Sequence, residues 1–120
     1  SVKFLGFRFG AEYEDLQKGA LVYIQATEVG GTHPALVESM GYANCVIANK
    51  TPENEEVLGS AGLFYQKNSP EDLAAKINKV LTDRAGLVTL RRAAFERANK
   101  HYDWEGVCNQ YEQLFLRLAP

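Results

Sequence analysis

The chain has little of what several classes of protein require. It has two cysteines and two histidines in 120 residues, and none stands at the short spacing of metal ligands. A formal net charge of −2 argues against a general nucleic-acid binder, which would be basic. No apolar run approaches the ~18 residues of a membrane-spanning helix, and the first residues form no signal peptide. These features predict a cytoplasmic protein with no metal, no cofactor and no nucleic-acid partner.

The composition supports one ordinary folded domain. Hydrophobic residues make up 46% of the chain and aromatic residues 11%, which is enough for a core. Cys45 lies in an apolar run and Cys108 in an amphipathic helical pattern. We therefore expect both to be small buried side chains rather than disulfide partners.

Strand-like apolar runs alternate with segments of helical periodicity. The predicted strand 20–25 is continuously apolar from Ala20 to Ile24, as expected of a strand covered on both faces. This alternation predicts an α/β fold, a Rossmann-like parallel sheet flanked by helices. Because a strand begins at the first residues, we expect residues 1–120 to be a single domain cut from a longer protein. The predicted strands are 2–6, 20–25, 45–48 and 62–65; the predicted helices are 12–18, 34–43, 55–59, one capped by Ser69, 87–100, and one capped by Asp103.

Finer expectations follow from the same patterns. Residues 49–54 read as a polar loop. Asn44 fits the left-handed position that ends a helix. The apolar stripe of the last helix, from Val107 to Leu118, is expected to belong to the core.

The most informative stretch is Gly30-Gly31-Thr32-His33-Pro34, between a predicted strand and a predicted helix. Glycines let backbone N–H groups approach an anion, and a helix start points free N–H groups at it. Glu38, one turn further on, would face the same mouth and could accept hydroxyl groups. The pair suits a sugar nucleotide. The alternatives are a tight turn capped by Thr32 or His33, and a solvated Glu38.

The ordered set of motifs resembles a known family over nearly the whole chain. It is similar to the C-terminal half of GT-B glycosyltransferases of the family-4 kind, and most similar to a rhamnosyltransferase-like subgroup with a Gly-Gly-Thr-x-Pro turn. The residues that carry the resemblance are Val2–Gly6, Gly30–Gly41, Val46–Ala48, Asn54–Gly59 with Ala61-Gly62, and Tyr102–Glu105 with Tyr111 and Leu114-Phe115.

The resemblance implies a function. In such enzymes this half binds a nucleoside-diphosphate sugar, and an N-terminal half, absent from these residues, holds the hydroxyl acceptor. Glu38 matches the second glutamate of the family's E-x7-E motif, which binds the ribose hydroxyls. The turn Gly30–Pro34 would face the diphosphate and the sugar. Asn49 and Asn54 would lie near the donor sugar, and with Glu28 they form a second rank of candidates.

The sequence also departs from the family. Gly30 stands where the first motif glutamate is expected, and Glu28 is out of register. Gln25 and Thr27 stand where some members of the subgroup have histidines. No catalytic residue is therefore assigned. The family's Arg and Lys for the diphosphate would precede Ser1.

These departures leave two alternatives open. One is another GT-B relative, such as a sugar-nucleotide epimerase. The other is a non-catalytic α/β binding module. A lipid acceptor would bring the protein to the inner membrane face through the absent half.

Overall fold

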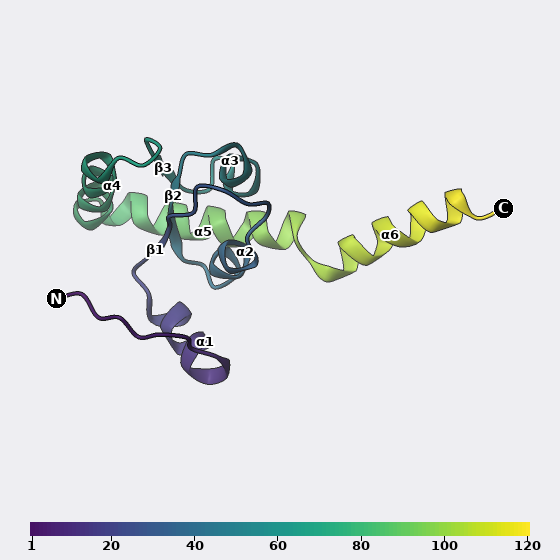
Figure 1. Cartoon of the computed structure of the whole chain (residues 1–120), viewed down its shortest axis with the longest axis horizontal. Helices are drawn as coiled ribbons and strands as arrows, with labels where there is room; N and C mark the ends of the chain where they lie inside the picture. The colour runs from purple at the N-terminus through teal and green to yellow at the C-terminus, as the bar shows by residue number, and fades with distance from the viewer.

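The computed structural model describes all residues, 1–120, and contains a three-stranded parallel sheet with helices on both faces (Figure 1). It confirms the predicted α/β fold. No helix is both long enough and apolar enough to cross a membrane. The elements are α1 (Gly10–Gly19), β1 (Val22–Gln25), α2 (Pro34–Gly41), β2 (Cys45–Asn49), α3 (Pro52–Leu58), β3 (Leu63–Tyr65), α4 (Pro70–Thr82), α5 (Arg84–His101) and α6 (Trp104–Leu118).

The sheet has the order β1-β2-β3, with Ile24 of β1 beside Ile47 of β2 and Ile47 beside Leu63 of β3. Every residue of β2 is buried. The prediction that the 20–25 run is covered on both faces is wrong, because β1 forms an edge of the sheet and Ile24 is 39% exposed. The strand that both faces cover is β2.

Alternate residues of β2 divide the core into two clusters, one on each face of the sheet. Val46 and Ala48 pack in a cluster with residues of α2, α3 and the second half of α5. Cys45 and Ile47 pack with residues of β3, α4 and the first half of α5. The long helix α5 contributes to both clusters, so it ties the two layers together. The buried position of Cys45 is as predicted.

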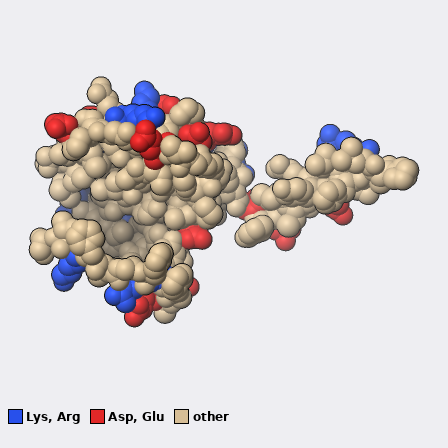
Figure 2. Space-filling view, viewed as in Figure 1, with Lys and Arg blue, Asp and Glu red and all other residues tan.

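The two ends of the chain differ from their predictions. Residues 2–6 form no strand, because a strand exists only by pairing and no neighbour pairs with them here; Phe4 is 97% exposed. Helix α6 contains no buried residue and projects as an arm with few charged side chains (Figures 1 and 2). Its stripe from Val107 to Leu118 is therefore not core, and Cys108 is exposed rather than buried.

Short-range signals predicted the starts of α2, α4 and α6 correctly, whereas α1 and α5 begin at Gly10 and Arg84, two and three residues before their predicted starts. Ser69 accepts a hydrogen bond from the Asp72 N–H, and Asp103 accepts one from the Gly106 N–H, so both caps are confirmed. Helix α3, however, begins at Pro52 inside the predicted loop, because Thr51 caps it by accepting from the Asn54 N–H.

The end of α2 also differs in one residue. Ala43, with φ 57°, takes the left-handed position expected for Asn44. Asn44 is fully buried instead, and its side-chain amide bonds Gln17 and Ser39. Those contacts explain why Asn44 is displaced from the turn position.

Candidate functional site

The candidate site lies at the edge of the sheet where all three strands end. Because the strands are parallel, Gln25, Asn49 and Tyr65 finish at the same edge, and the loops that follow them meet there. In open α/β sheets, ligands bind outside the carboxyl ends of the strands. The predicted turn, residues 30–34, belongs to the first of these loops.

An open hollow of about 570 Å³ lies between the end of β1 and the start of α2. Its walls combine aromatic, amide, hydroxyl and imidazole groups with small apolar side chains. The lining residues are Tyr23, Ile24, Gln25, Ala26, Thr27, His33, Pro34 and Ala35. The predicted His33 and Pro34 are thus on its wall.

Side chains of β1 and of the loop that follows it form consecutive hydrogen bonds along the wall of this hollow. The Tyr23 hydroxyl donates to Gln25 Oε1 at 2.8 Å, and Gln25 Nε2 donates to Thr27 Oγ1 at 2.7 Å. Burial first, and then the negative charge of Glu38, raise the pKa of Tyr23. The charge of Glu38 therefore acts at the wall of the hollow.

The turn between β1 and α2 has a geometry that requires glycine at its start. Gly30 has φ +142°, and a Cβ there would come within 2.7 Å of the His33 imidazole Cε1. His33 is the N-cap residue of α2 through its carbonyl, which accepts from the Leu36 N–H at 3.0 Å; its side chain makes no cap bond. Gly31 and Thr32 are exposed between them.

Glu38 lies one helical turn after Pro34 and Ala35, on the same face of α2. It does not line the hollow itself. Its carboxylate Oε2 accepts a 2.7 Å hydrogen bond from the Tyr13 hydroxyl of α1. Burial, and then this bond, raise the pKa of Tyr13 to about 12. Glu38 is thus beside the hollow and held from α1.

Asn49 joins the loops that follow the three strands. This buried side chain donates to the Thr27 carbonyl at 3.4 Å and to Asn68 Oδ1 at 3.1 Å, and it accepts from the Asn68 N–H at 3.1 Å. Asn54 donates to the Asn49 carbonyl at 3.0 Å, while its own buried Oδ1 has no partner. The hydrogen bonds of Asn49 and Asn54 therefore hold the loops at the carboxyl edge of the sheet in place.

Glu28, the remaining second-rank candidate, is exposed and 3.2 Å from the Lys67 ammonium. A hydrogen bond to Asn68, and then Lys67, lower the pKa of its carboxyl. The ionised, exposed Glu28 carboxylate therefore links the loop after β1 to the loop after β3. This arrangement does not suit a general base, which needs a raised pKa.

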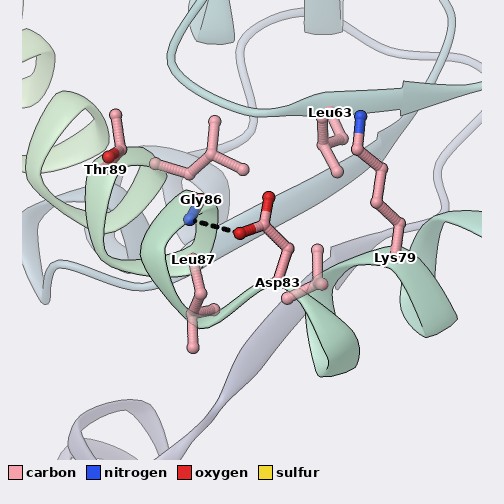
Figure 3. A pocket seen from close by; sticks show the side chains of 8 residues that line it. Leu63, Lys79, Asp83, Gly86, Leu87 and Thr89 are labelled. Carbon is pink, nitrogen blue, oxygen red and sulfur yellow. Dashed lines mark hydrogen bonds between the residues drawn. The ribbon is translucent and has the colours of Figure 1, made fainter.

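A second, more enclosed hollow of about 280 Å³ lies at the opposite edge, beside Leu63 at the start of β3 (Figure 3). Its polar groups are used locally: Asp83 caps α5 by accepting from the Gly86 N–H at 2.8 Å, and the Thr89 hydroxyl donates to a carbonyl of its own helix. Apolar side chains form most of the rest of its wall, and the remaining polar group is the Lys79 ammonium, which makes no hydrogen bond or ion pair. The hollow therefore offers one cation but no set of polar groups that could surround a polar ligand.

Sequence reasoning missed three residues that the fold brings to this region. Tyr13 and Asn68 contact Glu38 and Asn49, and Tyr23 lines the hollow. Tyr13 read as a packing residue because nothing local links it to a carboxylate 25 positions away. For Asn68, the only signal is its place in the loop after β3, at the same edge of the sheet.

The comparison with protein families places this geometry in context. Residues 1–83 match the family model described as Glycosyl transferases group 1. The chain belongs to the group 1 glycosyltransferases. The match includes the sheet, the turn of residues 30–34 and Glu38, and it ends just after α4.

This glycosyltransferase chain also matches solved structures. Sucrose-phosphate synthase from Thermosynechococcus elongatus superposes with a TM-score of 0.80 and 24% sequence identity, over 89% of this chain and 28% of that one. At this identity the likeness shows the fold, which is that of one Rossmann-like half of a GT-B enzyme. The chain thus spans less than a third of that relative's length. No curated protein sequence matched it.

Proposed function

We propose that this chain is the donor-binding half of a glycosyltransferase and holds a nucleoside-diphosphate sugar at the carboxyl edge of its sheet. One observation carries the proposal. The backbone N–H groups of residues 30–33 donate to no backbone carbonyl, and this segment leads into His33, Pro34 and Ala35, which line the hollow. Free N–H groups at a helix start bind anions, and the Glu38 carboxylate one turn below can accept two vicinal hydroxyls. This pair suits a diphosphate and a ribose.

The proposed reaction is transfer of the sugar to a hydroxyl acceptor. As the bond to the diphosphate breaks, negative charge develops on its oxygens, and N–H groups fixed in the turn would stabilise that charge. The Gly-Gly-Thr-x-Pro turn favours the rhamnosyltransferase-like subgroup within the family. An N-terminal half of the same protein would supply the acceptor site, in the cytoplasm or at the inner membrane face.

The test is a titration of the chain with UDP, GDP, dTDP and ADP, followed by amide chemical shifts. One nucleotide should bind and shift the amides of residues 30–33 and 35–38. Glu38→Ala should weaken binding, whereas Glu112→Ala, which removes an exposed carboxylate from α6, should not. The proposal fails if no nucleotide binds at millimolar concentration, or if the shifts gather around Leu63 and Asp83 instead.

A second candidate, a nucleotide-binding module without transfer, is favoured by Gly30. A glutamate there would need a backbone with φ +142° and would meet the His33 ring, so the first motif carboxylate has no place in this turn. The full-length protein separates the two candidates. Release of nucleoside diphosphate from a bound donor supports transfer, and binding without release supports the module.

A further inference from the structure

A chain of three hydrogen bonds links two buried amides to the Glu38 carboxylate. Asn44 Nδ2 donates to Gln17 Oε1 at 3.0 Å, Gln17 Nε2 donates to the Tyr13 hydroxyl oxygen at 2.9 Å, and the Tyr13 hydroxyl donates to Glu38 at 2.7 Å. Every link points in the same direction, so each bond polarises the next. The chain ends on a charged acceptor, the stronger kind of hydrogen bond.

The amide end of this chain is anchored in the protein. Asn44 is fully buried and also donates to the Ser39 hydroxyl at 3.1 Å, and Gln17 is only 5% exposed. These groups cannot turn toward water, so they hold the Tyr13 hydroxyl in one place. Lys18 adds a further contact between α1 and the residue that follows α2, with its ammonium 6.0 Å from the centre of the Tyr42 ring.

We propose that Tyr13 is a positioning residue for Glu38, which fixes the carboxylate so that its remaining lone pairs face the ribose hydroxyls of a bound nucleotide. This inference rests on the proposed donor role of Glu38. A carboxylate offers about four acceptor positions, and Tyr13 occupies one of them on Oε2. An exposed glutamate on a helix otherwise samples several rotamers, and holding one in advance lowers the entropy cost of binding.

The experiment is a double-mutant cycle of Tyr13→Phe and Glu38→Ala, in which each single change removes the bond between the two side chains, read by the dissociation constant of the nucleotide that binds the chain. Phenylalanine keeps the ring and removes only the hydroxyl. We expect Tyr13→Phe to weaken binding about threefold to tenfold, the effect of one net hydrogen bond. In the Glu38→Ala background, which leaves no carboxylate to position, the same change should have almost no effect. The matched control, Tyr42→Phe, removes a hydroxyl from the other end of α2 and should leave binding unchanged.

The outcomes distinguish failure of the positioning role of Tyr13 from failure of the proposed ribose-binding role of Glu38. If Glu38→Ala leaves the dissociation constant unchanged, the ribose role of Glu38 fails and the positioning role fails with it. If Glu38→Ala weakens binding but Tyr13→Phe does not, only the positioning role is wrong. An equal effect of Tyr13→Phe in both backgrounds would mean that Tyr13 contacts the nucleotide directly. Tighter binding by Tyr13→Phe would make Tyr13 a competitor for the carboxylate. Either of these results also overturns the inference.

A readout from the unmodified chain covers the case in which Tyr13→Phe does not fold. The ring carbon bearing the Tyr13 hydroxyl reports its ionisation by NMR. If Tyr13 stays on Glu38 in the complex, saturating nucleotide should leave its raised pKa in place. Burial, the larger cause of the raised pKa, remains in the complex, so loss of the bond to Glu38 would lower the pKa only in part. Such a fall would show that the ligand displaces Tyr13, and the inference would be wrong.

Discussion

Replacing Asn49 tests whether one buried side chain holds the three loops of the candidate site together. The Asn49 side chain is fully buried and makes two hydrogen bonds of 3.1 Å with Asn68 and a longer one of 3.4 Å to the Thr27 carbonyl. At roughly 1 kcal/mol for each short bond and less for the long one, Asn49→Ala should lower the free energy of unfolding by about 2–3 kcal/mol. Nucleotide binding should weaken as well, because the loop of residues 26–33 loses this tie.

The assay is urea unfolding, in which the midpoint should fall while the slope stays constant. Asn99→Ala, on the exposed surface of α5, is the matched control and should change the free energy by less than about 0.5 kcal/mol. Asn49→Asp keeps the shape but turns an oxygen toward Thr27 and Asn68 oxygens, so its loss should be larger at neutral than at acid pH. A loss from Asn49→Ala as small as the control's would refute the reasoning.

Three further predictions concern other parts of the fold. Gly59→Ala should lower the free energy of unfolding by about 1–3 kcal/mol, because its backbone has φ +54°. A further loss is expected because the new Cβ would lie 2.8 Å from Cζ of Arg97. The Arg97 guanidinium donates hydrogen bonds to two carbonyls of α3. That further loss should vanish in an Arg97→Ala background, whereas the control Gly41→Ala, at the end of α2, should not destabilise the chain. Urea unfolding measures the stability of all these variants, and a further loss that persists without Arg97 would contradict the steric explanation. Because the pKa of Tyr13 rises from 10.0 to about 12 on folding, the folded chain binds this proton more tightly, so stability should fall between these pH values, and a fall undiminished by Tyr13→Phe would count against it. Deleting residues 104–120 should change the free energy of unfolding by less than about 1 kcal/mol, since α6 buries no residue; a larger loss would show hidden packing.

The sequence by itself determined the features that depend on neighbours a few residues away. The alternation of strands and helices, the caps at Ser69 and Asp103, and the turn of residues 30–34 at the start of α2 all follow from local chemistry. Parallel strands place their carboxyl ends together, so the edge that carries the candidate site was also predictable.

Only the tertiary structure decided which of these elements meet. An amphipathic pattern indicates that a face can be buried but not which element covers it. For this reason the pattern of α6 predicts a core stripe, although the helix contains no buried residue. The same reason explains why β2, and not β1, became the buried strand. The bond from Tyr13 to Glu38 joins residues 25 positions apart, and Asn49 reaches Thr27 over 22. Such contacts depend on how α1 and the loops pack in space, and this packing cannot be predicted from the spacing of residues along the chain.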